Sequence, residues 1–258
     1  MRFYEPNESR WVSNVGFTFF YVTIMSFQGK NILVVGASSG IGHALAELLQ
    51  AEGANLFTAS RRLPEGINSQ HATWDVTQPA DGIFDHLPDV LHGIVYAPGT
   101  INLKPFQRLS VADFQNDFQV NVLGAVATIQ ANLARLRKAS GASIVLFSTV
   151  AVRTGMGFHA SIATAKGAVE GLTMSLAAEL APLKIRCNAL APSLTDTPLA
   201  GNLLSSDEKK EAGAKRHPLG RVGTAQDLAA FAKLLLSDEG SWVTGQIIGV
   251  DGGMGSLK

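Results

Sequence analysis

From Lys30 onward, hydrophobic residues form short continuous runs that alternate with long segments of helical spacing. Each short run has the length of a strand buried on both faces, and each long segment has one apolar side. The runs predict seven strands, at residues 31–35, 54–59, 71–75, 91–97, 143–148, 184–190 and 246–250. The longer segments predict a first helix that ends at Gln50 and further helices at residues 111–138, 161–181 and 224–237.

Strands that alternate with helices along the whole chain predict βαβ units, whose right-handed crossovers place helices on both faces of a sheet. We therefore expect an α/β fold, with a single doubly wound domain at residues 28–258 and a mostly parallel seven-stranded sheet. The length of 258 residues is ordinary for one such domain. Hydrophobic residues make up 46% and charged residues 16%, so the chain can bury a large core.

The charge balance and the cysteine count exclude several classes of function. Twenty-one Lys and Arg residues balance twenty-one Asp and Glu residues, which argues against a nucleic-acid partner. The single Cys187 excludes an internal disulfide and suits a reducing compartment, so we expect a cytoplasmic protein. The six histidines form no metal-binding motif, and we expect no metal site.

The first 27 residues need a separate explanation, because residues 11–25 are apolar and aromatic. This stretch is shorter than the roughly twenty residues that cross a membrane, and no cleavage site of small residues follows it. We expect residues 1–27 to be a poorly ordered extension, or Met25 to be the natural first residue. A membrane-surface anchor and a docking segment are the alternatives.

A glycine turn, Gly36-Ala-Ser-Ser-Gly40-Ile-Gly42, lies between the first predicted strand and its helix. Doubly wound sheets bind ligands at the carboxyl ends of their strands. Glycine lets the backbone approach a pyrophosphate closely, and the N-terminus of the following helix presents free N–H groups to the anion. The turn therefore predicts a nucleotide site, to which Ser38, Ser39 and Ile41 also belong.

The turn resembles that of the short-chain dehydrogenase/reductase family, and in particular of compact members such as the 3-oxoacyl carrier-protein reductases. The resemblance extends from Gln28 to near Met254. It includes, in family order, Asp75-Val76, Asn121, Ser148-Thr149, Ala165-Lys166, Asn188 to Pro192, Thr195 to Thr197, Pro218 to Gly223, Val243 to Gln246 and Asp251 to Gly253. It implies a Rossmann-type fold, a nicotinamide cofactor and a small-molecule substrate.

The end of the second strand bears on the choice of cofactor, because it reads Ala59-Ser60-Arg61-Arg62 where an acidic residue would favour NAD. A guanidinium binds phosphate through charge-assisted hydrogen bonds, and the Ser60 hydroxyl can donate another. We therefore expect NADP(H), with Arg61 at the 2′-phosphate. The family resemblance implies further cofactor contacts at Asp75, Val76, Gly99, Lys166, Pro192, Thr195 and Thr197.

The catalytic motif departs from the family pattern. The asparagine, serine and lysine positions of the family match Asn121, Thr149 and Lys166, whereas its catalytic tyrosine position is Ile162. Ser148 precedes the serine position by one residue, so its side chain is expected on the other face of the strand. The usual Asn-Asn-Ala-Gly turn reads Tyr96-Ala97-Pro98-Gly99.

Isoleucine has no ionisable proton, so the family mechanism cannot run unchanged, and three groups could replace the tyrosine as the acid. His159 precedes Ile162 by three residues and shares a face with it if that turn is helical. A partly exposed loop histidine without a catalytic role is the alternative. Thr149 can hydrogen-bond a carbonyl but is a poor acid, and a water held near Lys166 is the third possibility.

Two functions remain open from the sequence. The first is an atypical NADP(H)-dependent oxidoreductase that acts on a carbonyl or alcohol substrate by hydride transfer. The second is a nucleotide-binding scaffold or sensor with little or no redox activity. The intact glycine turn suits both, the missing tyrosine favours the scaffold, and the retained Asn121, Thr149 and Lys166 favour the enzyme.

Two further segments suggest how a substrate and a second subunit contact the chain. The segment after Thr197 is the expected lid, and its Leu199, Leu203 and Leu204 suit either an apolar substrate or one face of a surface helix. Residues 111–138 carry more apolar residues than one core-facing stripe needs, and we expect a homodimer or homotetramer. The residues that suggest this surplus are Val122, Leu123, Val126 and Ile129.

Overall fold

The computed structural model describes residues 27–257. The expected N-terminal extension therefore lies outside the described residues, apart from its last residue. Phe27 is fully buried, and its main-chain N–H donates to the Glu52 carbonyl oxygen at 3.1 Å. No helix among residues 27–257 has the length and hydropathy needed to cross a membrane.

A seven-stranded sheet forms the centre of the molecule, as predicted. Its strands are β1 (Asn31–Val35), β2 (Asn55–Ser60), β3 (Ser69–Thr73), β4 (Gly93–Tyr96), β5 (Ala142–Phe147), β6 (Ile185–Pro192) and β9 (Ile247–Val250). They lie in the order β3-β2-β1-β4-β5-β6-β9, and every neighbouring pair is parallel. The order reverses between β1 and β4, which is where such sheets bind ligands.

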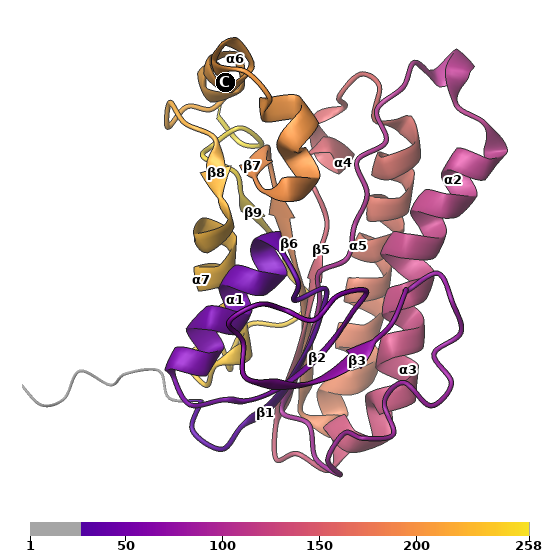
Figure 1. The fold of residues 1–258 in the computed structure, drawn as a ribbon, viewed down its shortest axis with the longest axis vertical. Coiled ribbons are helices and arrows are strands. Elements are labelled where there is room, and N and C mark those ends of the chain that lie inside the picture. Colours follow the sequence, from indigo (N-terminus) through magenta and orange to yellow (C-terminus); the bar gives the residue numbers. More distant parts are fainter. Residues whose placement is uncertain (1–26, 258) are drawn as a thin grey trace, which may run out of the picture.

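Helices cover both faces of the sheet. They are α1 (Gly40–Ala51), α2 (Val111–Phe118), α3 (Gly124–Arg137), α4 (Ala151–Thr154), α5 (Ala160–Leu180), α6 (Asp207–Lys215) and α7 (Ala225–Leu236). Figure 1 shows α1 and α7 on one side of the sheet and α2, α3 and α5 on the other. The short helical segments are η3 (Phe106–Arg108), η5 (Ala181–Leu183) and η6 (Pro198–Leu204).

The continuous apolar run of β1 fills two cores at once. Successive side chains of a strand point to opposite faces. Ile32 and Val34 pack with α1 and α7, whereas Leu33 and Val35 pack on the side of α3 and α5. This two-sided burial explains why the sequence of the strand is uninterrupted by polar residues.

The predicted helix 111–138 contains a change of geometry that the sequence pattern did not reveal. Between α2 and α3, the segment η4 (Gln119–Leu123) is a π-helical turn, a feature often found at functional sites. The expectation that Val122 and Ile129 add surplus surface is wrong, because both pack in the core against the sheet. Leu123 is the exposed member of that group, at 43%.

Several boundaries and small elements also differ from the prediction. The third strand ends at Thr73, so Asp75 and Val76 lie in the loop that follows it. The sixth strand continues to Pro192. Strands β7 (Thr195–Asp196) and β8 (Gly223–Thr224) form a separate pair that was not predicted, because two residues are too few to show a periodic pattern.

Candidate active site

The glycine turn after β1 has a backbone geometry that depends on glycine at three positions. Gly36 and Gly40 have φ values of 85° and 58°, in the left-handed region that favours glycine. A Cβ atom on Gly42 would lie 2.4 Å from the carbonyl oxygen of Gly36. The N-cap of α1 is Ser39, whose side chain makes no capping hydrogen bond. The turn and the first N–H groups of α1 therefore form a cradle suited to an anion.

The loops that follow β4 and β6 meet this turn. A Cβ on Gly36 would lie 3.0 Å from the Cδ of Pro98, in the loop after β4, and one on Gly40 would lie 3.4 Å from Thr197, beyond β6. The carbonyl oxygen of Pro192 accepts from the main-chain N–H of Val150 at 3.1 Å, which joins the ends of β5 and β6. Thr195 is buried, and its hydroxyl donates to the Ser193 carbonyl oxygen at 3.1 Å.

The ends of β2 and β3 form the next part of the site. The carboxylate of Asp75 accepts from the N–H and the hydroxyl of Thr77 at 2.9 and 2.8 Å, and these bonds lower its pKa. The positive charge of Arg61 adds to this lowering, so the two side chains lie near each other. Arg61 is exposed and forms no salt bridge with a residue in 27–257.

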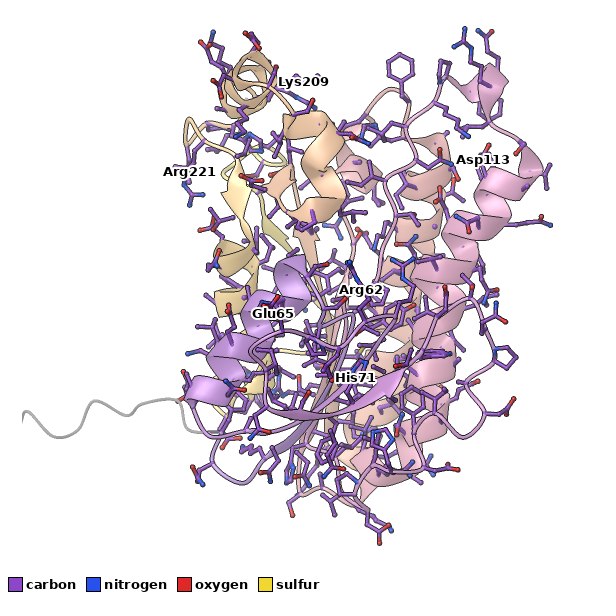
Figure 2. All side chains as sticks on the ribbon, in the orientation of Figure 1. Arg62, Glu65, His71, Asp113, Lys209 and Arg221 are labelled. Atoms are coloured by element: carbon purple, nitrogen blue, oxygen red, sulfur yellow. The ribbon has the colours of Figure 1, made fainter. Side chains whose placement is uncertain are left out.

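Ser60 differs from the expectation for a phosphate donor. Its hydroxyl donates to the carbonyl oxygen of Arg62 at 2.8 Å, so the single proton of this hydroxyl shapes the loop instead. Figure 2 labels Arg62 on the same loop after β2. The side chains of Arg61 and Arg62 on this loop are exposed.

Lys166 and Asn121 meet at Gly99. A Cβ on Gly99 would lie 3.6 Å from the Lys166 Nζ and 3.4 Å from the Asn121 Oδ1. The Lys166 ammonium is buried and donates to the Phe147 carbonyl oxygen at 2.8 Å. Burial lowers the pKa of Lys166 to about 8, while the negative charge of Asp117 opposes this effect. Asn121 Oδ1 is buried without a hydrogen-bond partner among the described residues.

The two hydroxyls at the end of β5 have different surroundings. The Ser148 hydroxyl donates to Glu170 Oε1 at 2.8 Å, so it is engaged with a carboxylate on α5, a partner that Thr149 does not share. Thr149 is half-buried, and its Oγ1 accepts from the main-chain N–H of Ala151 at 3.3 Å. The Ser148 hydroxyl therefore donates its proton to a protein acceptor, whereas the Thr149 hydroxyl only accepts among the described residues.

His159 and Ile162 both lie at the beginning of α5. Helix α5 begins at Ala160, and His159 is its N-cap with φ −101° and ψ 9°. The His159 carbonyl oxygen accepts from the main-chain N–H of Ala163 at 2.7 Å, so a helical hydrogen bond closes the turn that joins His159 to Ile162. Its Nδ1 donates to the Gly157 carbonyl oxygen at 2.6 Å, because a carbonyl oxygen can only accept. Ile162 is only 5% exposed and lies on α5, one turn before Lys166.

Three side chains in this region were missed by the sequence analysis. Asp117 on α2 is fully buried, and its carboxylate accepts from the hydroxyls of Thr100 at 2.6 Å and Ser161 at 2.5 Å. One signal was available in the sequence. Asp117 and Asn121 are separated by four residues, the spacing of neighbours on one helix face.

The remaining predictions concern two apolar cofactor contacts, the lid and a metal site. Val76 packs against the core, as does Ile41. Of the three lid leucines, only Leu199 is exposed, whereas Leu204 is buried. Figure 1 shows α6 beyond the same ends of the strands. Among the described residues, no group of three or more His, Cys, Asp or Glu side chains is placed to hold a metal ion.

Comparison with known proteins identifies relatives over most of the chain. A family model described as enoyl-(acyl carrier protein) reductase matches residues 36–255. A tropinone reductase homolog of Arabidopsis thaliana is 33% identical, over 89% of this chain and 94% of its own. A 3-oxoacyl-[acyl-carrier-protein] reductase of Aquifex aeolicus is 30% identical, over 89% and 99%.

Solved structures give the same result. Ligand-free aldohexose dehydrogenase of Thermoplasma acidophilum superimposes with a TM-score of 0.81 at 31% identity, over 88% of this chain and 94% of that one. A 3-ketoacyl-(acyl-carrier-protein) reductase of Brucella melitensis, complexed with NADH, gives 0.80 at 25% identity, over 89% and 100%.

Proposed function

The chain belongs to the short-chain dehydrogenase/reductase family, and we propose that it is an atypical NADP(H)-dependent oxidoreductase acting on a carbonyl or alcohol substrate by hydride transfer. One observation carries the proposal. The buried Lys166 ammonium and the Asn121 amide oxygen both face Gly99, in the loop that borders the glycine turn. Polar groups this deeply buried are unfavourable unless a partner or a ligand satisfies them.

The residues of the site fit a nicotinamide dinucleotide. The cradle at Gly42 would be filled by a Cβ, and the N-terminus of α1 is not capped by a side chain. These features suit a pyrophosphate. The exposed guanidinium of Arg61 suits a 2′-phosphate, and the family resemblance assigns Asp75 and Val76 to the adenine end. Thr195 and Thr197, beside the turn, are proposed to contact the phosphates or the nicotinamide.

Each catalytic side chain has a proposed task. Bound NADPH supplies the hydride. The Lys166 ammonium donates hydrogen bonds that hold the cofactor ribose, and the Thr149 hydroxyl donates to the substrate oxygen. Ile162 occupies the position of the family's tyrosine and offers no proton. The chain is therefore an oxidoreductase whose binding groups are retained and whose usual acid is replaced.

The second candidate is a nucleotide-binding scaffold, and the burial of Ile162 at 5% exposure favours it. A packed aliphatic side chain at this position contributes to the core and cannot take part in proton transfer. The scaffold has the same cofactor cradle as the enzyme. Both candidates are therefore expected to bind the cofactor, and only the enzyme is expected to oxidise NADPH with a carbonyl substrate.

The test uses purified protein, NADPH and a panel of aldehydes and ketones, with the absorbance of the reduced nicotinamide as readout. We expect slow oxidation of NADPH that depends on the carbonyl and is lost in Lys166→Met. Calorimetry with NADPH alone measures binding separately. Binding without oxidation for any carbonyl would exclude the enzyme and favour the scaffold, and absence of binding would exclude both.

A further inference from the structure

Asp117 is a fully buried carboxylate that none of the roles proposed above uses. Its Oδ1 accepts from the Thr100 hydroxyl at 2.6 Å and its Oδ2 from the Ser161 hydroxyl at 2.5 Å. Among the described residues it has no cation within salt-bridge distance. A buried carboxylate contributes less to stability than an apolar side chain of similar volume, so packing alone does not account for Asp117.

The hydrogen bonds of Asp117 lead directly to Asn121. The amide nitrogen of Asn121 donates to the Thr100 hydroxyl at 2.9 Å and to the main-chain carbonyl oxygen of Asp117 at 2.8 Å. Both amide hydrogens are thereby used, and the orientation of the amide is fixed. Its oxygen is left near Gly99, and so is the Lys166 Nζ. Thr100 is thus the link between the carboxylate and the catalytic asparagine.

The surroundings of Lys166 show which charges act on it. From α2 comes the carboxylate of Asp117, which favours the ammonium form, whereas burial disfavours it. Glu170 lies one turn further along α5, but the Ser148 hydroxyl and the Arg153 guanidinium bind its carboxylate. The strand β5 contributes only the uncharged carbonyl of Phe147. Asp117 is therefore the acidic group available to balance the buried ammonium.

We propose that Asp117 is a positioning residue that holds Lys166 as an ammonium and fixes the amide of Asn121, so that Lys166 supplies the proton that the family takes from tyrosine. The catalytic part of this inference rests on the proposed function. In reduction, the hydride from NADPH reaches the carbonyl carbon, and a proton from Lys166 reaches the carbonyl oxygen through a bridging water. The products are the alcohol, NADP+ and a neutral amine, which regains its proton from solvent.

The first experiment measures the titration of Lys166 directly, in protein without cofactor. Lysine labelled with carbon-13 at Cε gives one signal per residue, and the Lys166 signal is identified by its loss in Lys166→Arg. We expect a midpoint near pH 8 and a fall of about one pH unit or more in Asp117→Asn, because a nearby opposite charge contributes that much. Glu170→Gln, which removes the other buried acid next to Lys166, is the matched control and should leave the midpoint unchanged.

Equal midpoints in Asp117→Asn and the unmutated protein would overturn the proposal, as would equal shifts in both variants. If Asp117→Asn does not fold, the triple variant Asp117→Val, Thr100→Val, Ser161→Ala removes the network without leaving unpaired hydroxyls. It should lower the midpoint in the same way, and an unchanged midpoint in it would equally overturn the proposal.

The second experiment follows NADPH oxidation against pH. The rate should fall as pH rises through the Lys166 midpoint, and Asp117→Asn should move this fall to lower pH. A rate independent of pH between about 6 and 10 would overturn the role of Lys166 as acid. If the unmutated protein oxidises no NADPH at all, the proposed function fails, while the titration still decides whether Asp117 positions Lys166.

Discussion

Arg61 gives a direct test of cofactor choice. Arg61→Ala should remove most of the preference for NADPH over NADH. A hydrogen bond to a charged group contributes about 1.5 to 3 kcal/mol, which corresponds to roughly tenfold to over a hundredfold in affinity. The Arg61 side chain is exposed, and solvent screens such contacts, so we expect a loss near the lower end of this range.

A second effect acts in the same direction. Hydrogen bonds from Thr77, and to a smaller extent the charge of Arg61, lower the pKa of Asp75, so an ionised carboxylate lies close to the proposed 2′-phosphate position. Without Arg61, this negative charge acts on the phosphate unopposed. NADPH should therefore lose affinity in Arg61→Ala, whereas NADH, which has no 2′-phosphate, should be little affected.

Calorimetry with each cofactor measures both affinities. Arg62→Ala is the matched control, because it removes an exposed guanidinium from the same loop and keeps the main-chain carbonyl that Ser60 binds. We expect it to change the cofactor preference by less than about threefold. Equal affinities of the unmutated protein for NADPH and NADH would refute the reasoning, and so would an equal loss for both cofactors in Arg61→Ala.

Three further predictions concern the turn, the acid and assembly. Gly42→Ala places a methyl group 2.4 Å from a main-chain carbonyl oxygen. We expect it to lower the affinity for NADPH and for NADH at least about tenfold, measured by calorimetry, and the free energy of unfolding by about 1 to 3 kcal/mol, measured by thermal melting. Unaltered affinities would contradict the role of this turn in cofactor binding. Ile162→Tyr should raise the rate on activated ketones about tenfold or more, and His159→Ala should leave it within about threefold, whereas a loss near 10²-fold would make His159 the acid. Phe118 and Leu123 are 38% and 43% exposed and line a groove of 480 Å³ between α2 and α5; light scattering should give a dimer or tetramer that Leu123→Glu weakens, and a monomer mass would exclude this surface as an interface.

The sheet and its order of elements could be predicted because buried parallel strands leave a strong local signal. In residues 31–35, both faces of the strand need apolar side chains, so the sequence shows an unbroken run. The glycine turn could be located for a similar reason, because the positive φ of Gly36 and the contact at Gly42 each depend on neighbouring residues. Geometry that depends only on neighbouring residues can be predicted from a short segment of sequence.

The polar network could not be predicted, because its members come from distant parts of the chain. Ser161 meets Asp117 across 44 residues, and no pattern within either helix indicates that contact. The same holds for Ser148, whose partner Glu170 lies on another element. The π-helical turn at residues 119–123 was missed for a related reason, since its sequence is equally compatible with an ordinary helix.

The absence of tyrosine at position 162 and the presence of the Asp117 network are related in chemical terms. A phenol next to Lys166 would be both a proton donor and a partner for the lysine, and Ile162 is neither. The buried ammonium then needs another source of electrostatic balance, and the charge of Asp117 favours the ammonium form. Asp117 is buried although a carboxylate is unfavourable there, and each of its oxygens accepts one hydrogen bond. Such a side chain is expected where function, rather than stability, has selected it. On this argument, the loss of the tyrosine is compensated within the same site, and a search for the acid should begin with Lys166 and the groups that hold it.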